Sequence, residues 1–278
     1  MLMSGEQIDI IKARVRGASH KLKGIECQDS FKISQMGEVT VLAVADGHGS
    51  DSCPHSRTGS EIAVNVFHSL MKKYCLVYSH DADSPKTLEA YFKREGNHAI
   101  AKAIENEWKS RVENNYRKRL GSGNLGDAKI LPQIWKLHGT TLLGLVITPT
   151  FYFAFRLGDG DLLCINHDGV VSDLVIDEKI LGVETHSLSR ENAWEKSRTS
   201  TISTGEMDVG RNFAFMLSTD GFSNSYPTEE AFYRTCLDYY SAIKEHGAEI
   251  VQKNLRKWLE ETSKDGSGDD ITVLFAVV

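Results

Sequence analysis

Short apolar runs, bounded by glycine, aspartate or other polar residues, recur along the chain and predict β-strands. They lie at residues 31–33, 39–45, 140–147, 151–157, 161–165, 213–218 and 271–278. We expect 31–33 and 39–45 to pair as a hairpin, because only a few residues separate them. The three central runs follow one another so closely that they predict a meander.

Apolar residues at helical spacing predict three helices. The first covers residues 60–71, after the glycine-rich turn that starts at Gly47, and Ser60 is its expected N-cap. In the second, apolar residues recur every four positions from Ile100 to Val112, and the charged residues between them form a solvated face. The third helix is predicted by an apolar stripe from Val251 to Leu259.

Two stretches show neither the pattern of a strand nor the spacing of a helix. Residues 117–136 contain glycines and a proline, which predicts a surface loop. Residues 168–210 are polar and irregular, and we expect them to form a flap over a site. The chain has 23 glycines but only 5 prolines, a balance that suits tight turns better than long linkers. We therefore expect residues 1–278 to form a single domain.

The composition excludes several classes of partner. The formal charge is −6, so no positive field draws in nucleic acid or an anionic membrane, and we expect neither as a partner. The most apolar stretch, 142–155, is broken by polar residues and is shorter than the roughly 20 residues that a bilayer requires. The N-terminus lacks the features of a signal peptide, and the 5 cysteines are odd in number and widely spaced. This usage favours a reducing, cytoplasmic location.

Aspartates stand at the ends of several predicted strands. Asp46, Asp159 and Asp220 each follow an apolar run and precede a glycine, while Asp29 and Asp269 stand just before such runs. A single Asp-Gly pair after a strand is an ordinary turn. However, a strand that ends at one edge of an antiparallel sheet neighbours a strand that begins there. The five side chains are therefore expected to crowd one rim of a sheet.

Crowded carboxylates repel one another and persist only where protons or metal ions neutralise them. Oxygen ligands favour hard cations, which indicates Mg²⁺ or Mn²⁺ rather than zinc or copper. An EF-hand is excluded at 265–270, because Asp270 stands where that loop requires glycine. A dinucleotide site is excluded at Gly158-Asp159-Gly160, which lacks a third glycine opening a helix.

His48 follows Asp46 and Gly47 directly, which places an imidazole beside the expected metal ions. A histidine in a turn is by itself more often structural. Beside two cations, however, it has a chemical use: metal-activated water attacks a phosphorus in line, and a neighbouring His⁺ protonates the departing alkoxide. This combination suits phosphate-ester hydrolysis with His48 as the general acid.

Six blocks of the sequence, in order, resemble those of the type 2C metal-dependent Ser/Thr protein phosphatases, the PPM family. Together they span nearly the whole chain, and their order is far more specific than any one block. The blocks are Cys27-Gln28-Asp29-Ser30-Phe31, Val44-Ala45-Asp46-Gly47-His48-Gly49, Gly139-Thr140-Thr141-Leu142, Gly158-Asp159-Gly160, Ser218-Thr219-Asp220-Gly221-Phe222 and Gly268-Asp269-Asp270-Ile271-Thr272-Val273.

The resemblance implies an α+β fold, a four-layer α/β/β/α sandwich of two mainly antiparallel sheets flanked by helices. It also implies a phosphatase domain that hydrolyses phosphoserine and phosphothreonine on proteins with metal-activated water. Such an enzyme would act on a phosphoprotein substrate and be paired with a Ser/Thr kinase in a signalling pair. We expect it to be a monomer.

The resemblance implies a role for each matching residue. Asp46 would bridge two Mn²⁺ or Mg²⁺ ions, with the carbonyl of Gly47 on one of them and Asp220 and Asp269 on the other. Asp29 would support the site directly or through water. Two further roles follow: Asp159 matches a possible third metal site, and His48 matches the general acid.

The chain departs from the family pattern at several positions. Gln28 replaces an acidic residue, and Gly24 stands where many members have a phosphate-binding Arg. Lys21, Lys23 and Arg57 are the nearby cations that could grip phosphate instead, and Lys23 is our candidate, although Lys lacks the planar fork of Arg.

Of two further positions, one concerns the charge of the expected site and the other the branch of the family that the chain resembles. Asp161 replaces another Arg and adds negative charge near the expected ions. The spacing of Gly17-Ala18-Ser19-His20 before the first acidic block resembles a divergent, mainly bacterial branch of the family, in which we interpret His20 as structural.

Two alternative functions remain open. The replacement by Gln28 and the missing Arg favour a catalytically weak pseudophosphatase or a regulatory module that binds phosphoproteins. A metal-dependent phosphoesterase acting on a small molecule is the other alternative, because residues 168–210 carry no readable substrate signature.

Overall fold

The computed structural model describes residues 8–77, 84–120, 130–176, 185–206 and 213–278. Within them the chain forms two five-stranded antiparallel sheets. The first sheet has the order β1 (Asp9–Val15), β10 (Ile271–Val277), β9 (Ala214–Ser218), β6 (Asp161–Ile165) and β7 (Val171–Asp173). The second has the order β2 (Ser30–Met36), β3 (Val39–Ala45), β4 (Leu142–Ile147), β5 (Phe151–Leu157) and β8 (Arg198–Ser203).

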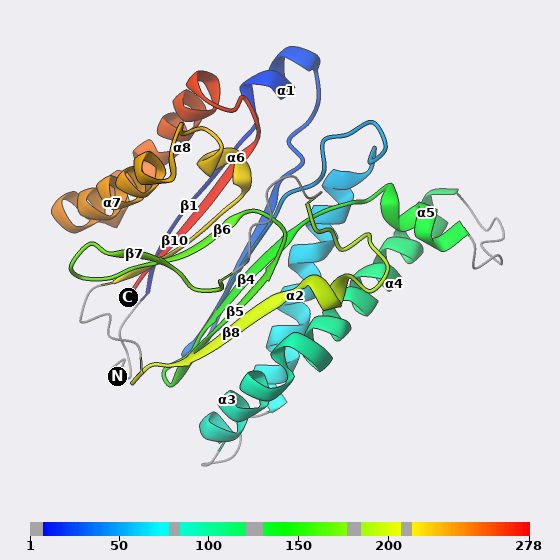
Figure 1. Cartoon of the computed structure of the whole chain (residues 1–278), viewed down its shortest axis with the longest axis horizontal. Coiled ribbons are helices and arrows are strands. Elements are labelled where there is room, and N and C mark those ends of the chain that lie inside the picture. The colour runs from blue at the N-terminus through cyan, green and yellow to red at the C-terminus, as the bar shows by residue number, and fades with distance from the viewer. Residues whose placement is uncertain (1–7, 78–83, 121–129, 177–184, 207–212) are drawn as a thin grey trace.

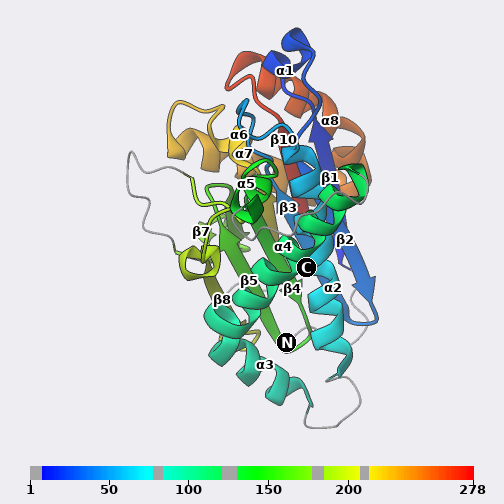
Figure 2. The same cartoon turned by 90° about the vertical axis from the view of Figure 1, so that its right-hand side faces the viewer.

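Helices cover the outer face of each sheet (Figure 1). On the second sheet lie α2 (Ser56–Val77), α3 (Ser84–Glu95) and α4 (Ala101–Leu120), with a π-helical turn (Gly96–Ile100) between the last two and α5 (Leu131–Lys136) against α4. On the first sheet lie α7 (Glu229–His246) and α8 (Ala248–Asp265). Shorter elements are α1 (Ala18–Lys23), α6 (Asp220–Ser223) and a 3₁₀ turn (Ala193–Lys196). The view in Figure 2 shows α2 and α4 lying over the second sheet.

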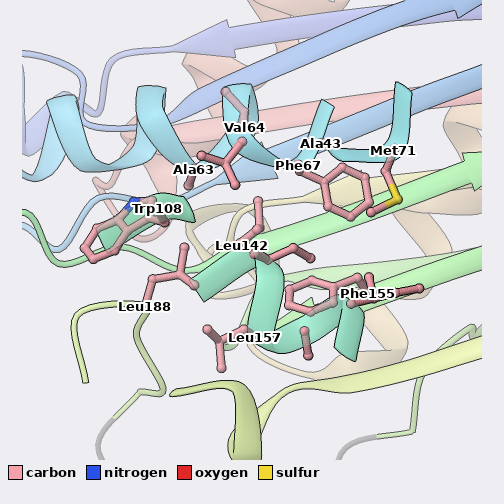
Figure 3. Close-up of a cluster of buried hydrophobic side chains, with 14 of the residues drawn as sticks. Ala43, Ala63, Val64, Phe67, Met71, Trp108, Leu142, Phe155, Leu157 and Leu188 are labelled. Carbon is pink, nitrogen blue, oxygen red and sulfur yellow. The ribbon is translucent and has the colours of Figure 1, made fainter. Parts of the chain in front are cut away.

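The core forms three apolar layers, which explains why the strands are apolar at consecutive positions. In β3, Val41 and Ala43 face the helices α2 and α4, whereas Leu42 and Val44 face the first sheet. Successive side chains of a strand point to opposite faces, so a strand covered on both sides must be apolar at every position. Figure 3 shows the helix-side layer, where Phe67 lies among side chains of α2 and the second sheet.

The predicted fold class is confirmed, because two antiparallel sheets lie between layers of helices. The hairpin of β2 and β3 and the helical stripe from Ile100 to Val112 are also confirmed. The meander is wrong in its third strand. β4 and β5 pair, but β6 belongs to the other sheet and pairs with β7 and β9. The turn with Gly158 at φ +112° carries the chain from one sheet to the other.

Three local expectations are corrected. α2 begins at Ser56, so Ser60 is not its N-cap; the Ser60 hydroxyl instead donates to the carbonyl of Gln28. The expected loop at 117–136 is helical in its described parts, which complete α4 and form α5, while 121–129 lie outside the described residues. The expected flap at 168–210 contains the edge strands β7 and β8, while 177–184 and 207–210 lie outside the description.

Among the other elements that were not expected from the sequence, the three longest are β1, α3 and α7, and two of them carry a signal. In β1 the residues Ile11, Ala13 and Val15 are buried at period two, the mark of a half-buried strand. α7 begins with Thr228 accepting a hydrogen bond from the backbone N–H of Ala231, an N-cap followed by buried residues at helical spacing. The third unexpected element, α3, carries no such signal.

None of the helices in the described part of the chain is long and apolar enough to cross a membrane.

Candidate active site

A cleft of about 830 Å³ opens where strand ends of the two sheets meet. Asp46 follows β3 of the second sheet, Asp220 follows β9 of the first, and Asp269 precedes β10. Asp159 lies in the turn that crosses from β5 to β6. All four line the cleft. The expectation of one crowded rim is therefore corrected in one respect, because the rim is shared by two sheets.

The carboxyl groups of Asp46 and Asp220 lie close enough to interact with each other directly. Burial, followed by the charges of Asp29 and Asp220, raises the pKa of Asp46 well above its usual range. Burial, followed by the charge of Asp159, raises the pKa of Asp220 to about 6. Like charges this close cannot all ionise without a neutralising partner.

Asp29 lies behind the cleft rather than in its lining. It is 1% exposed, and its Oδ2 accepts hydrogen bonds from the hydroxyls of Thr219 at 2.8 Å and Thr272 at 2.7 Å. These contacts tie the start of β2 to the first sheet. Burial, followed by the charge of Asp270, raises the pKa of Asp29 to about 8.

The carboxylates fit a bound cation. Burial and mutual repulsion raise the pKa values of Asp46 and Asp220, and a metal ion between these carboxylates would neutralise the repulsion. Asp29 Oδ1 is buried without a hydrogen-bond partner, which leaves a carboxylate oxygen able to accept from a metal-bound water. An oxygen-rich donor set of this kind suits Mg²⁺ or Mn²⁺.

Gly47 and His48 form the floor of the cleft beside Asp46. A Cβ on Gly47 would lie 2.8 Å from the backbone oxygens of Gln28 and Ser56, so only glycine fits between these segments. The backbone N–H of His48 donates to the carbonyl of Gly139 at 3.0 Å. The absence of a side chain on Gly139 leaves room for the imidazole, because a Cβ there would lie 2.6 Å from His48 Cδ2.

Asp159 is held by the segment that precedes β8. The hydroxyl of Thr185 donates to Asp159 Oδ2 at 2.5 Å. Thr185 and the residues at 187 and 189–191 line the cleft as well. Part of the stretch predicted as a flap therefore borders the site, whereas other described parts of it form the strands β7 and β8.

The expected phosphate ligand Lys23 is exposed at the end of α1 and does not line the cleft. The two other candidates are engaged elsewhere: Lys21 lies 3.6 Å from Glu260, and Arg57 pairs with Glu26 and Glu61.

Two cations that sequence reasoning missed do line the cleft, Lys136 at the end of α5 and Arg190. No spacing signal in the sequence indicates either.

A buried ion pair supports this wall of the cleft. Lys109 pairs with Glu105 on α4 and lies 4.2 Å from the ring centre of Trp135. Lys109 Nζ also donates to the carbonyl of Arg190 at 2.9 Å, and Glu105 Oε2 accepts from the backbone N–H of Trp194 at 2.7 Å. The charged residues expected on a solvated face of this helix thus include a pair that fixes the cleft wall.

Comparison with known proteins places this arrangement in a family. Residues 16–260 match the family model of protein phosphatase 2C. No match was found among curated protein sequences.

Similar solved structures cover almost the whole chain. The serine/threonine phosphatase Stp1 from Staphylococcus aureus is 12% identical, with a TM-score of 0.62 over 100% of this chain and 98% of that one. The catalytic domain of the serine threonine protein phosphatase PstP, in complex with 2 manganese ions, is 14% identical, with a TM-score of 0.56 and 98% of both chains covered. RsbX in complex with magnesium is 16% identical, with a TM-score of 0.53 over 99% of this chain and 98% of that one.

At these identities the structures show a shared fold, while the match over 16–260 concerns the sequence itself. The matched residues include His48 and the carboxylates Asp29, Asp46, Asp159 and Asp220, and Asp269 follows just beyond them. This chain belongs to the protein phosphatase 2C family.

Proposed function

We propose that this protein hydrolyses phosphoserine and phosphothreonine on proteins with metal-activated water. The observation that carries the proposal is the meeting of Asp46, Asp220 and Asp269 with His48 in one cleft. Membership of a phosphatase family supports the reaction class. The magnesium and manganese complexes of RsbX and PstP support the choice of cation.

Two Mn²⁺ or Mg²⁺ ions would be held by Asp46 and the carbonyl of Gly47 on one side and by Asp46, Asp220 and Asp269 on the other. When bound, such ions lower the pKa of a coordinated water and polarise the phosphoryl group. Asp29 orients the site from behind through its contacts with sheet threonines. Asp159 is the residue that would hold a third ion.

His48 supplies the proton for the leaving group. Its imidazole lines the cleft, and its backbone is fixed by the hydrogen bond to Gly139. The alkoxide of serine or threonine is a poor leaving group, so a proton donor at this position assists departure. Lys136 and Arg190, which also line the cleft, offer positive charge to the phosphate or to acidic residues around it.

We further propose a monomeric enzyme of a reducing, cytoplasmic compartment that reverses the action of a Ser/Thr kinase. All 5 cysteines are unpaired in the structure, which is consistent with such a compartment. The formal charge of −6 gives no reason to expect a nucleic-acid or membrane partner.

The test is phosphate release from a phosphothreonine peptide, measured with Mn²⁺, with EDTA and with the Asp220→Asn variant. A nucleoside monophosphate serves as the parallel small-molecule substrate. We expect Mn²⁺-dependent release from the peptide that both EDTA and the variant abolish. Release from the nucleotide alone would favour a small-molecule phosphoesterase. Binding of the peptide without release, despite metal binding shown by calorimetry, would favour a regulatory binding module.

A further inference from the structure

His20 lies in the cleft between the two neighbouring aspartates Asp269 and Asp270. Its side chain is 12% exposed and lines the cleft. The ring nitrogen Nε2 is 3.7 Å from Asp269 Oδ1, and Nδ1 is 3.0 Å from Asp270 Oδ1. One possible ligand atom from each of the three side chains lies within 4.8 Å of those of the other two.

The backbone around His20 is fixed against the turn that carries these aspartates. Ser19 donates to the carbonyl of Gly268 through both its backbone N–H at 2.9 Å and its hydroxyl at 2.7 Å. A Cβ on Gly17 would lie 2.5 Å from the same carbonyl oxygen, so only glycine allows this approach. The imidazole is therefore held in place before any ion binds.

Both carboxylate oxygens of Asp270 accept hydrogen bonds from the backbone, so we expect Asp270 to stand behind the metal ligands rather than to bind the ion itself. Its Oδ1 accepts from the backbone N–H of Gly17 at 2.6 Å, and its Oδ2 accepts from that of Gln28 at 2.7 Å. Asp270 Oδ1 also lies 3.0 Å from His20 Nδ1, which is not in line for a hydrogen bond. A carboxylate beside one ring nitrogen favours a proton there and leaves the other nitrogen free to bind a metal.

The distance between His20 Nε2 and Asp269 Oδ1, on the other side of the imidazole ring, allows both atoms to bind the same ion. The 3.7 Å between His20 Nε2 and Asp269 Oδ1 is too long for a hydrogen bond. Two ligand atoms at this separation can both bind a single ion with bonds of about 2.1 Å.

Gln28 provides an independent sign of a ligand at this place. The residue is 9% exposed, and its Oε1 is buried without a hydrogen-bond partner. A Cβ on Gly49 would lie 3.2 Å from this oxygen and 3.7 Å from His20 Nε2, so both atoms border the same space in front of Gly49. An unpaired buried carbonyl oxygen is costly unless a ligand or its water shell completes it.

We propose that His20 is a metal ligand, and that its Nε2 binds the ion held by Asp269. The inference rests on the proposed function, which gives Asp269 its role at the metal site. With His20 included, the ligands of the site would be oxygen and nitrogen atoms instead of oxygen atoms alone. Imidazole binds Mn²⁺ more readily than Mg²⁺, which prefers oxygen donors, so His20 should bias the site toward Mn²⁺.

The test is pulsed electron paramagnetic resonance of the full chain loaded with a single equivalent of Mn²⁺. We expect modulation from imidazole ¹⁴N in the wild type, replaced by the ¹⁵N pattern when the protein carries ring-labelled histidine. His48→Gln removes the other histidine of the cleft and is expected to keep the signal. His20→Gln is expected to lose it. Calorimetry should show Mn²⁺ affinity falling about 10- to 100-fold in His20→Gln, with Mg²⁺ affinity changing less.

The outcomes separate this inference from the proposed function. Tight Mn²⁺ binding without histidine modulation overturns the role of His20 and leaves the metal site in place. Loss of the signal in His48→Gln instead also overturns it, because the nitrogen ligand would then be His48. No Mn²⁺ binding at all overturns the proposed function itself. If His20→Gln does not fold, the labelled wild type and His48→Gln still decide.

Discussion

Asp220 shows how crowding acts on a single residue of the proposed metal site. Its carboxylate accepts a hydrogen bond from Asn224 at 2.9 Å and interacts with the carboxyl group of Asp46. Burial and the charge of Asp159 raise its pKa to about 6, so the metal-free cleft retains protons that a divalent ion would displace. The sequence identified this residue correctly as part of the cluster, because an aspartate after a buried strand is a local pattern.

Replacing Asp220 by asparagine keeps the shape of the side chain and removes its charge. Phosphatase activity is expected to fall by at least about 100-fold, since loss of a supporting residue alone costs 10- to 100-fold. The free energy of unfolding of the metal-free protein should stay the same or rise, because a crowded negative charge is gone. Asp265→Asn, on the exposed end of α8, is the matched control. Full activity of Asp220→Asn would contradict the assignment.

His48→Ala tests the proton donor. The loss of rate should be far larger on phosphothreonine peptides than on activated aryl phosphates, because an aryl leaving group departs without protonation. General acid catalysis typically contributes about 10²- to 10⁴-fold, which sets the size of the expected loss on peptides. Kinetic constants on both substrates provide the measurement. Equal losses on the two would argue against the role of His48.

At the scale of elements, packing between a helix and a strand sets the rigidity behind the cleft. Gly144 on β4 faces α2, where a Cβ would lie 2.2 Å from the ring of Phe67. The strand and the helix therefore approach as closely as their side chains allow. The apolar run of β4 was enough to predict a strand, but the need for glycine at this contact depends on Phe67, which is remote in the chain.

Gly144→Ala is expected to destabilise the protein by about 1–3 kcal/mol, because the added methyl overpacks the core. The measurement is chemical denaturation followed by circular dichroism. Gly205→Ala is the matched control, since a Cβ there meets nothing within 4 Å. A neutral effect of Gly144→Ala would mean that Phe67 moves aside without cost.

At the scale of the whole molecule, stability is linked to the charge of the site. The pKa values of Asp29 and Asp220 are raised from 3.8 to about 8 and about 6 in the folded state. Groups raised in this way contribute stability that is fully present below their ordinary pKa and is lost as the pH rises through the folded values. In the metal-free protein, the uncompensated negative charge of these carboxylates is therefore largest at neutral and alkaline pH.

Mn²⁺ is accordingly expected to raise the melting temperature more at about pH 8 than at about pH 5, because at the lower pH protons already neutralise the carboxylates. Thermal denaturation with and without Mn²⁺ at both pH values gives the comparison. Buried histidines outside the cleft lining, such as His68 and His138, affect both arms alike. In Asp220→Asn the difference between the two pH values should shrink. A larger Mn²⁺ effect at the lower pH would contradict this account.

The order of residues along the chain is enough to identify most of the strands and the residues of the proposed site. Apolar runs predict buried strands from neighbours in the chain, and the aspartates and His48 can be identified from the blocks in which they stand. These signals are local, since strand and helix periods act over a few residues.

The pairing of strands and the meeting of distant side chains, in contrast, depend on packing in the folded molecule. β6 joins the first sheet rather than continuing the meander, because pairing with β9 is a long-range contact that no local period encodes. Lys136 and Arg190, rather than Lys23, line the cleft for the same reason. His20 reaches Asp269 from the other end of the chain, through a backbone approach that Gly17 alone permits. Residue types set the chemistry that is available, and packing across the two sheets determines where it is gathered.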